Sequence, residues 1–294
     1  MRTAYLYLLF LSLFATGCTS STRQTDKERL YVSILPLRSI IEQIVGDDFK
    51  VDVLVPAGAS PESFEPTPRQ YVALNRSKLV FNVGLIDFEQ NLLRDFPDRE
   101  KLVNLSRGIR LLEGSCAHGH THEPTGKARA SEGHAHGIDP HIWTSPRALK
   151  QMAANAYDAL RTSFPDSVRY TENYEKLLVR LDSLDTACAE ALRQVHTIVI
   201  YHPALTYYAA DYGLEQLAVE HDGKEPSARH LARLIEEARR KKVRRVFYQA
   251  QYPASTVKVI AEDIGARSVK IDPLREDVIE NIGEITRQLT SGNE

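Results

Sequence analysis

Beyond its first 18 residues, the sequence lacks any run of about 20 consecutive apolar residues, which is the length a membrane-spanning helix needs. It also lacks an excess of one charge, because 37 lysines and arginines face 39 aspartates and glutamates. This balance indicates neither a nucleic-acid-binding surface nor an acidic tail. No HExxH, GxSxG or Gly-rich phosphate-loop motif occurs, which argues against an enzyme. The 294 residues, 43% of them hydrophobic, suit a globular protein of one or two domains.

Cysteine is scarce, with three residues at Cys18, Cys116 and Cys188. A disulfide between Cys116 and Cys188 is not expected, since Cys116 lies in a histidine-rich loop. Cys188 falls on the apolar stripe of a predicted helix and is interpreted as a small buried hydrophobe.

The N-terminus has the layout of a secretory signal over residues 1–18: Arg2 precedes an apolar run over residues 4–15, and small residues follow. Cys18 comes directly after "ATG", which resembles the lipobox of bacterial lipoproteins, although Ala15 stands where that motif usually has leucine. The sequence therefore predicts a lipidated Cys18 followed by a polar tether over 19–28. A plain secreted protein with an incidental cysteine is the alternative.

From residue 29 onward, apolar runs alternate with segments of helical periodicity, which predicts parallel sheets covered by helices. The expected strands are 29–35, 49–56, 78–84, 101–106, 196–201, 215–221, 243–249 and 266–272. The pattern restarts after an apolar stripe over 171–195, which is typical of one continuous helix of about 37 Å at ~1.5 Å per residue. We expect two α/β lobes, 29–170 and 196–294, joined by this helix, with a ligand in the crevice between them.

A histidine-rich segment, 116–138, interrupts the first lobe and has no apolar period. Its alternating histidines predict auxiliary transition-metal binding in a loop, although a purely solvating loop is the alternative. The histidines in question are His118, His120, His122, His134 and His136.

Four other side chains stand at or just after predicted strands or rigid turns: Glu62, His141, His202 and Asp272. Ligand-binding groups of α/β sheets cluster outside the carboxyl ends of the strands. Taken singly, each of these residues is more often a capping or hydrogen-bonded residue than a ligand. Taken together, two from each lobe, they predict a metal site between the lobes.

The segments "PAGASPESFEPTP", "DPHIWTSP", "YHPALTYYAADYGL", "EPSA" and "IDPL" occur in this order. In these motifs the chain resembles the zinc/manganese class of solute-binding proteins of bacterial ABC importers, from about residue 30 to the C-terminus. The histidine-rich insertion is typical of the zinc-importing branch. The resemblance implies capture of a divalent metal on the periplasmic side of the cell envelope and delivery to an inner-membrane ABC permease. It also implies a monomeric, membrane-anchored lipoprotein that is not an enzyme and binds no nucleic acid.

The resemblance implies His141, His202 and Asp272 as metal ligands. The family usually has histidine as first ligand, where this sequence has Glu62. Two imidazoles and two carboxylates suit zinc, and also manganese, because oxygen ligands favour harder ions. The histidine-rich loop favours zinc (Zn2+), with Mn2+ as the alternative.

Several neighbouring residues leave alternatives open. Tyr207 and Tyr208 either line the cleft or pack in the core. Glu65 is interpreted as a solvated charge, and His221 and His230 are interpreted as structural residues.

Two other classes of protein compete with metal capture: a zinc hydrolase that uses the same four positions, and a surface adhesin of the cell-adhesion type found among relatives. We predict little movement between the lobes, because a single long helix limits their opening.

Overall fold

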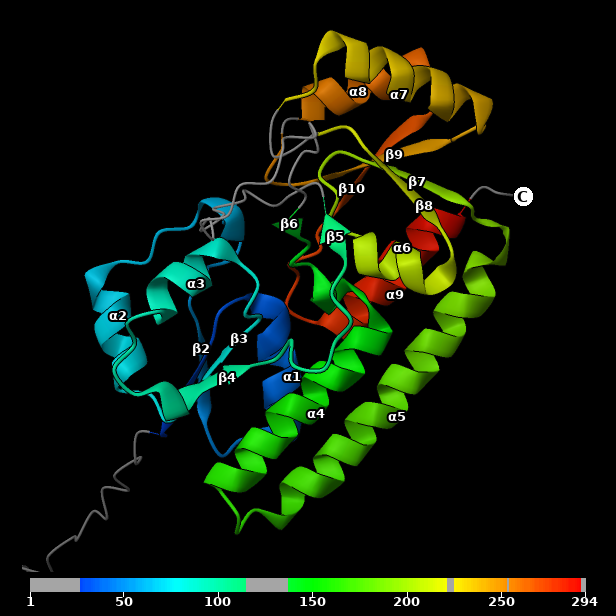
Figure 1. Cartoon of the computed structure of the whole chain (residues 1–294). Helices are drawn as coiled ribbons and strands as arrows, with labels where there is room; N and C mark the ends of the chain where they lie inside the picture. The colour runs from blue at the N-terminus through cyan, green and yellow to red at the C-terminus, as the bar shows by residue number, and fades with distance from the viewer. Residues whose placement is uncertain (1–26, 115–136, 221–224, 253, 292–294) are drawn as a thin grey trace, which may run out of the picture.

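The computed structural model of the protein describes residues 27–114, 137–220, 225–252 and 254–291. Two α/β lobes lie one above the other in Figure 1, with the long helices α4 and α5 alongside them. The first lobe contains β1 (Arg29–Val32), α1 (Leu35–Val45), β2 (Lys50–Val53), the 3-10 turn η1 (Pro61–Ser63), α2 (Pro68–Asn75), β3 (Val80–Asn82), α3 (Asp87–Leu93), η2 (Arg99–Lys101), β4 (Leu102–Asn104), β5 (Glu113–Gly114), β6 (Gly137–Ile138), η3 (Ile142–Thr144) and α4 (Pro146–Ser163). After α5 (Val168–Ala191) and η4 (Leu192–Gln194), the second lobe contains β7 (Thr197–Ile200), α6 (Thr206–Tyr212), β8 (Glu215–Ala218), α7 (Ala228–Arg240), β9 (Arg245–Gln249), α8 (Ala254–Asp263), β10 (Arg267–Ile271) and α9 (Val278–Thr290).

The two large sheets share one topology. The first has the order β2-β1-β3-β4 and the second the order β10-β9-β7-β8, and every strand pair in both is parallel. In each sheet the first strand in the chain, β1 or β7, lies between the second and the third. The chain therefore crosses from one side of the first strand to the other after the second strand. This reversal forms the topological switch point beside which α/β proteins bind ligands. The predicted strands and the two-lobe α/β fold are confirmed.

The connecting helix is confirmed as α5, which begins at Val168, three residues before the predicted start. It packs against α1 and α4 of the first lobe and α9 of the second. Its apolar stripe includes Leu177, Leu181 and Cys188, which are at most 1% exposed. The Cys188 prediction is thus confirmed, and its thiol lies 3.2 Å from the Thr286 hydroxyl. The helix is therefore built into the core along its length.

One hydrophobic core runs through both lobes, since Phe81, Leu181 and Ile271 belong to the same buried cluster. A smaller cluster fills the space between the second sheet and the helices α7 and α8. A shared core makes separation of the lobes costly, because it would expose apolar area.

Two features were not predicted from the sequence. Helix α4 begins at Pro146, the last residue of the motif "DPHIWTSP", and the Ser145 hydroxyl caps it by accepting from the backbone N–H of Ala148. Strands β5 and β6 form an antiparallel pair in which Gly114 faces Gly137. Gly137 and Ile138, which we placed in the loop, therefore belong to a strand.

None of the helices among the described residues is both long and apolar enough to cross a membrane. Cys18, the signal and most of the tether lie outside the described residues. The same holds for Cys116, His221 and the loop histidines.

Candidate metal centre

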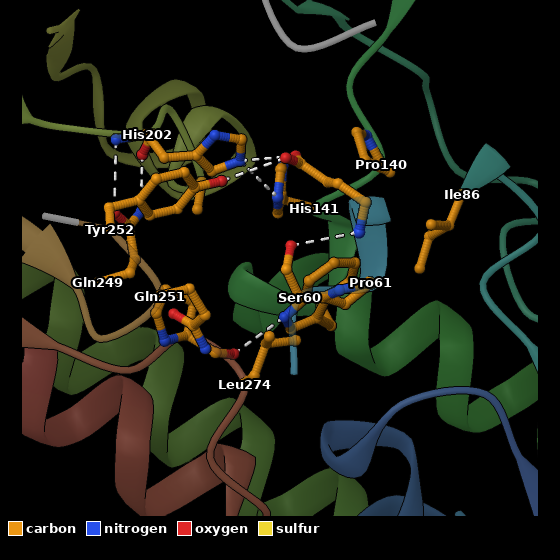
Figure 2. A pocket seen from close by; sticks show the side chains of 14 residues that line it. Ser60, Pro61, Ile86, Pro140, His141, His202, Gln249, Gln251, Tyr252 and Leu274 are labelled. Atoms are coloured by element: carbon orange, nitrogen blue, oxygen red, sulfur yellow. Dashed lines mark hydrogen bonds and ion pairs between the residues drawn. The ribbon is translucent and has the colours of Figure 1, made fainter. Parts of the chain in front are cut away.

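Glu62, His141 and His202 converge in a pocket between the lobes, with one ligand atom from each lying within 4.8 Å of the others. The Nε2 atoms of the two histidines are 3.4 Å apart, and His202 Nε2 is 2.8 Å from Glu62 Oε1. Figure 2 shows His141 and His202 facing each other across this pocket. The structure thus brings together three of the four predicted ligands.

Glu62 reaches the pocket from η1, a short turn after strand β2. Ser60 caps this turn, since its hydroxyl accepts from the backbone N–H of Glu62 at 3.3 Å. Pro61, which is buried, fixes the backbone at the first position of the turn. Capping and proline together fix the loop that carries the carboxylate.

His141 is fixed by Asp139, a carboxylate that is 0% exposed. Asp139 Oδ1 lies 2.9 Å from His141 Nδ1 and accepts the backbone N–H of His141 at 2.8 Å. The Thr206 hydroxyl, from the second lobe, donates to Asp139 Oδ2 at 2.6 Å. Both lobes therefore help to orient this imidazole.

His202 follows β7 at the switch point of the second sheet. Its Nδ1 lies 2.8 Å from Oε2 of Glu220, a buried carboxylate just after β8. Gln249, at the end of β9, donates to the His202 carbonyl at 2.7 Å and accepts its backbone N–H at 3.4 Å. Three neighbouring strand ends thus hold one imidazole.

In both histidines Nδ1 faces a carboxylate that can hold the proton of that nitrogen, and Nε2 of each ring faces the other ring across the pocket. Tetrahedral zinc at about 2.0–2.1 Å from two imidazole nitrogens holds them about 3.3–3.4 Å apart. The Nε2 atoms of His141 and His202 already stand at 3.4 Å. The distance from Glu62 Oε1 to His202 Nε2, 2.8 Å, would have to lengthen by about half an ångström to match this spacing.

Two carboxylates beside the histidines, Glu62 and Asp139, have a lowered pKa. Burial alone would raise the pKa of Glu62, but hydrogen bonding and the charges of His202 and His141 lower it below its usual value. Burial also acts against the charge of Asp139, yet His141 and the hydrogen bonds lower the pKa of that group as well. Glu62 Oε1 is buried and lies 2.8 Å from His202 Nε2. A buried carboxylate beside two imidazole nitrogens is a ligand set that a divalent cation can bind.

Asp272 lies outside this group. It directly follows β10, but its Oδ1 accepts the backbone N–H of Leu274 at 3.0 Å, and its carbonyl accepts the side-chain amide of Asn281 at 2.7 Å. Asp272 lines a neighbouring cavity together with Gly58 and Ala59. The next residues, Pro273 and Leu274, do line the pocket of the three ligands. The role of Asp272 as fourth ligand stays a prediction.

The other residues singled out from the sequence lie away from the three ligands. Tyr207 and Tyr208 are buried, with their hydroxyls on the Asp139 carbonyl and the Thr286 hydroxyl, so packing is the better interpretation. Glu65 is exposed, as expected of a solvated charge. His230 lies in α7 with Nε2 3.1 Å from the Ala218 carbonyl.

Sequence reasoning missed the residues that support the ligands: Asp139, Glu220, Gln249 and Tyr252. Glu220 and Gln249 stand at the carboxyl ends of strands, and the rule that selected His202 would have selected them too. Asp139 lies two residues before His141, which is a spacing that suits an Asx-type contact. Tyr252 carries no such signal, because its position depends on how the turn after β9 folds.

Two lobes that enclose buried imidazoles and a carboxylate define a metal-ion-binding protein of the two-lobed α/β class. A model of the family described as "Zinc-uptake complex component A periplasmic" (ZnuA) matches residues 30–290. The chain belongs to this family. The assignment confirms the resemblance to solute-binding proteins of ABC importers and the prediction that the chain is not an enzyme.

Individual relatives agree with this assignment. The chain is 26% identical over 271 residues to the zinc-binding lipoprotein AdcA of Streptococcus pneumoniae (strain ATCC BAA-255 / R6), covering 90% of this chain and 53% of AdcA. It is 28% identical over 283 residues to the high-affinity zinc uptake system protein ZnuA of Bacillus subtilis (strain 168), covering 90% and 85%. A crystal structure of ZnuA superposes with a TM-score of 0.80 at 30% identity, covering 92% of this chain and 100% of that chain. The chain thus spans about half the length of AdcA and most of the length of the B. subtilis protein.

Proposed function

We propose that this protein captures a zinc ion outside the inner membrane and delivers it to an ABC permease. The observation that carries the proposal is the pair of buried imidazoles, each held at Nδ1 by a carboxylate, with the Nε2 atoms 3.4 Å apart beside Glu62. Nitrogen and carboxylate ligands in this spacing suit tetrahedral zinc. The zinc-binding relatives and the family description support the same metal. Manganese is the alternative cargo.

We further propose that Glu62, His141 and His202 are the direct ligands and that the histidine-rich segment supplies auxiliary, weaker sites. Lipidation at Cys18, a periplasmic location and a monomeric state are part of the same proposal. The lipobox-like N-terminus and the name of the lipoprotein AdcA support the anchor.

Metal titration tests the proposed function. The full chain, purified without chelators, is titrated with zinc against a chromophoric competitor, in parallel with a variant in which residues 116–136 are replaced by a short turn. Gly114 and Gly137 are paired, so the described residues that flank the replaced segment lie side by side and a short turn can join them. We expect one tight zinc ion per chain in both proteins and additional weak sites only in the full chain. Loss of the tight ion with the segment would overturn the assignment to the three residues, and metal-dependent ester or peptide hydrolysis would favour the hydrolase.

Asp272→Asn distinguishes a three-residue site from a four-residue site. Asparagine keeps the oxygen that accepts the Leu274 N–H but removes the charge. Because the described conformation holds Asp272 outside the cluster, we expect zinc affinity to fall by about tenfold or less. A loss as large as that of a histidine ligand, measured in the same competition titration, would instead establish Asp272 as the fourth ligand.

A further inference from the structure

The two oxygens of the Glu62 carboxylate have different surroundings. Oε1 is buried in the pocket and lies 2.8 Å from His202 Nε2. Oε2 accepts a hydrogen bond from the Tyr252 hydroxyl at 3.1 Å. One oxygen is thus presented to the metal position, while the other is already engaged by the second lobe.

Tyr252 is itself held firmly against the site. Its ring stacks on the His202 imidazole, with centroids 5.0 Å apart and planes at 13°, and it also packs on Tyr201 at 5.1 Å. Its backbone N–H donates to the carbonyl of Gln249, the residue whose side chain fixes the His202 backbone. Figure 2 shows Tyr252 beside His202 and above Gln249. The hydroxyl therefore moves with the ligand His202 and not with the loop of Glu62.

A carboxylate can bind a metal through one oxygen or through both. Tetrahedral zinc needs only one oxygen from Glu62, because its small coordination number is nearly filled by the imidazoles. Larger, harder ions that take six or more ligands gain from a second oxygen in the same carboxylate. A hydrogen bond to Oε2 competes with this second contact.

We propose that Tyr252 is a specificity-determining positioning residue: its hydroxyl holds Glu62 to one-oxygen ligation and so disfavours manganese relative to zinc. The inference rests on the proposed function, since it concerns the choice of metal at the same site. It concerns Glu62, the ligand position at which the family usually has histidine. A histidine at position 62 would have no second oxygen for the Tyr252 hydroxyl to hold.

Tyr252→Phe tests the proposal, because it keeps the ring that stacks on His202 and removes only the hydroxyl. Zinc affinity is measured by chelator competition, and manganese affinity by titration followed with electron paramagnetic resonance. We expect zinc binding to weaken by about tenfold and manganese binding to stay unchanged or tighten, so that the zinc-to-manganese affinity ratio falls by about tenfold or more. Zinc-edge absorption of the loaded variant should show a second oxygen contact that the parent protein lacks.

Tyr157→Phe is the matched control, since it removes a hydroxyl that bonds Thr171 on the surface formed by α4 and α5 and should leave both affinities unchanged. In a Glu62→His background, Tyr252→Phe should leave the metal ratio unchanged, which a double-mutant cycle detects. If Tyr252→Phe weakens zinc and manganese by the same factor, the hydroxyl only supports the fold and the proposal is overturned. If the parent protein binds no zinc tightly, the proposed function itself fails, and this outcome is visible before any variant is made.

Discussion

Replacing His202 with alanine is expected to abolish tight zinc binding. Structural zinc sites gain about 10–16 kcal/mol in total, so an equal share for one ligand of three or four is roughly 3–4 kcal/mol. This corresponds to an affinity loss of about several hundredfold. We expect the loss of zinc affinity at His202 to exceed the loss for a ligand at the edge of the pocket, because the His202 side chain also contacts Glu220 through Nδ1 and stacks on Tyr252.

The same substitution has a second consequence for the apo protein. It leaves the buried Glu220 carboxylate without its imidazole partner, and an uncompensated buried polar group costs about 1–3 kcal/mol. His202→Ala should therefore lower both zinc affinity and the free energy of unfolding. The measurements are chelator competition and urea unfolding without metal.

His196→Ala provides the control. His196 is exposed and directly precedes β7, at the end of this strand opposite to His202 and away from the pocket. It should change neither quantity. If His202→Ala keeps the affinity of the parent protein, the tight ion is bound elsewhere in the chain, and the metal centre described here is wrong.

The fold could be predicted from the sequence because the information is local. Most strands of the two sheets lie in short segments rich in apolar residues, and the stripe of α5 recurs at helical spacing, so the local pattern locates them. Helix α4 escaped this reasoning although Ser145 and Pro146 mark its start. Its buried face is rich in alanine, including Ala148, Ala153 and Ala156, and alanines make a weak apolar stripe.

The ligands could be predicted only in part, for a physical reason. Strand ends predict which side chains reach the edge of a sheet, and this rule located His202 correctly beside His141 and Glu62. It does not predict where a side chain turns after the strand. Asp272 ends its strand as expected, but the nearby N–H of Leu274 competes for its carboxylate. Such local competition depends on the turn geometry, which the sequence pattern does not contain.

Trp143→Ala is expected to cause the largest loss of stability. Trp143 lies in η3 of the first lobe, is 1% exposed, and donates its indole N–H to the carbonyl of Pro273 in the second lobe at 3.0 Å. Truncating a buried tryptophan costs about 3–5 kcal/mol through lost burial and the cavity left behind. In a domain of this size, that loss lowers the melting temperature by roughly 10 °C.

The substitution should also weaken zinc binding, because the indole packs against the ligand His141, with ring centroids 5.0 Å apart. Trp143→Phe separates the two contributions: it keeps an aromatic ring in the core but leaves the Pro273 carbonyl without its donor. We expect it to lie between the parent protein and Trp143→Ala in urea unfolding, while Val179→Ala, at a site 65% exposed on α5, should match the parent protein. An unfolding free energy of Trp143→Ala within about 1 kcal/mol of the parent value would contradict this role. The lobes would then be held together by α5 and the shared core alone, and the indole would be only a wall of the metal pocket.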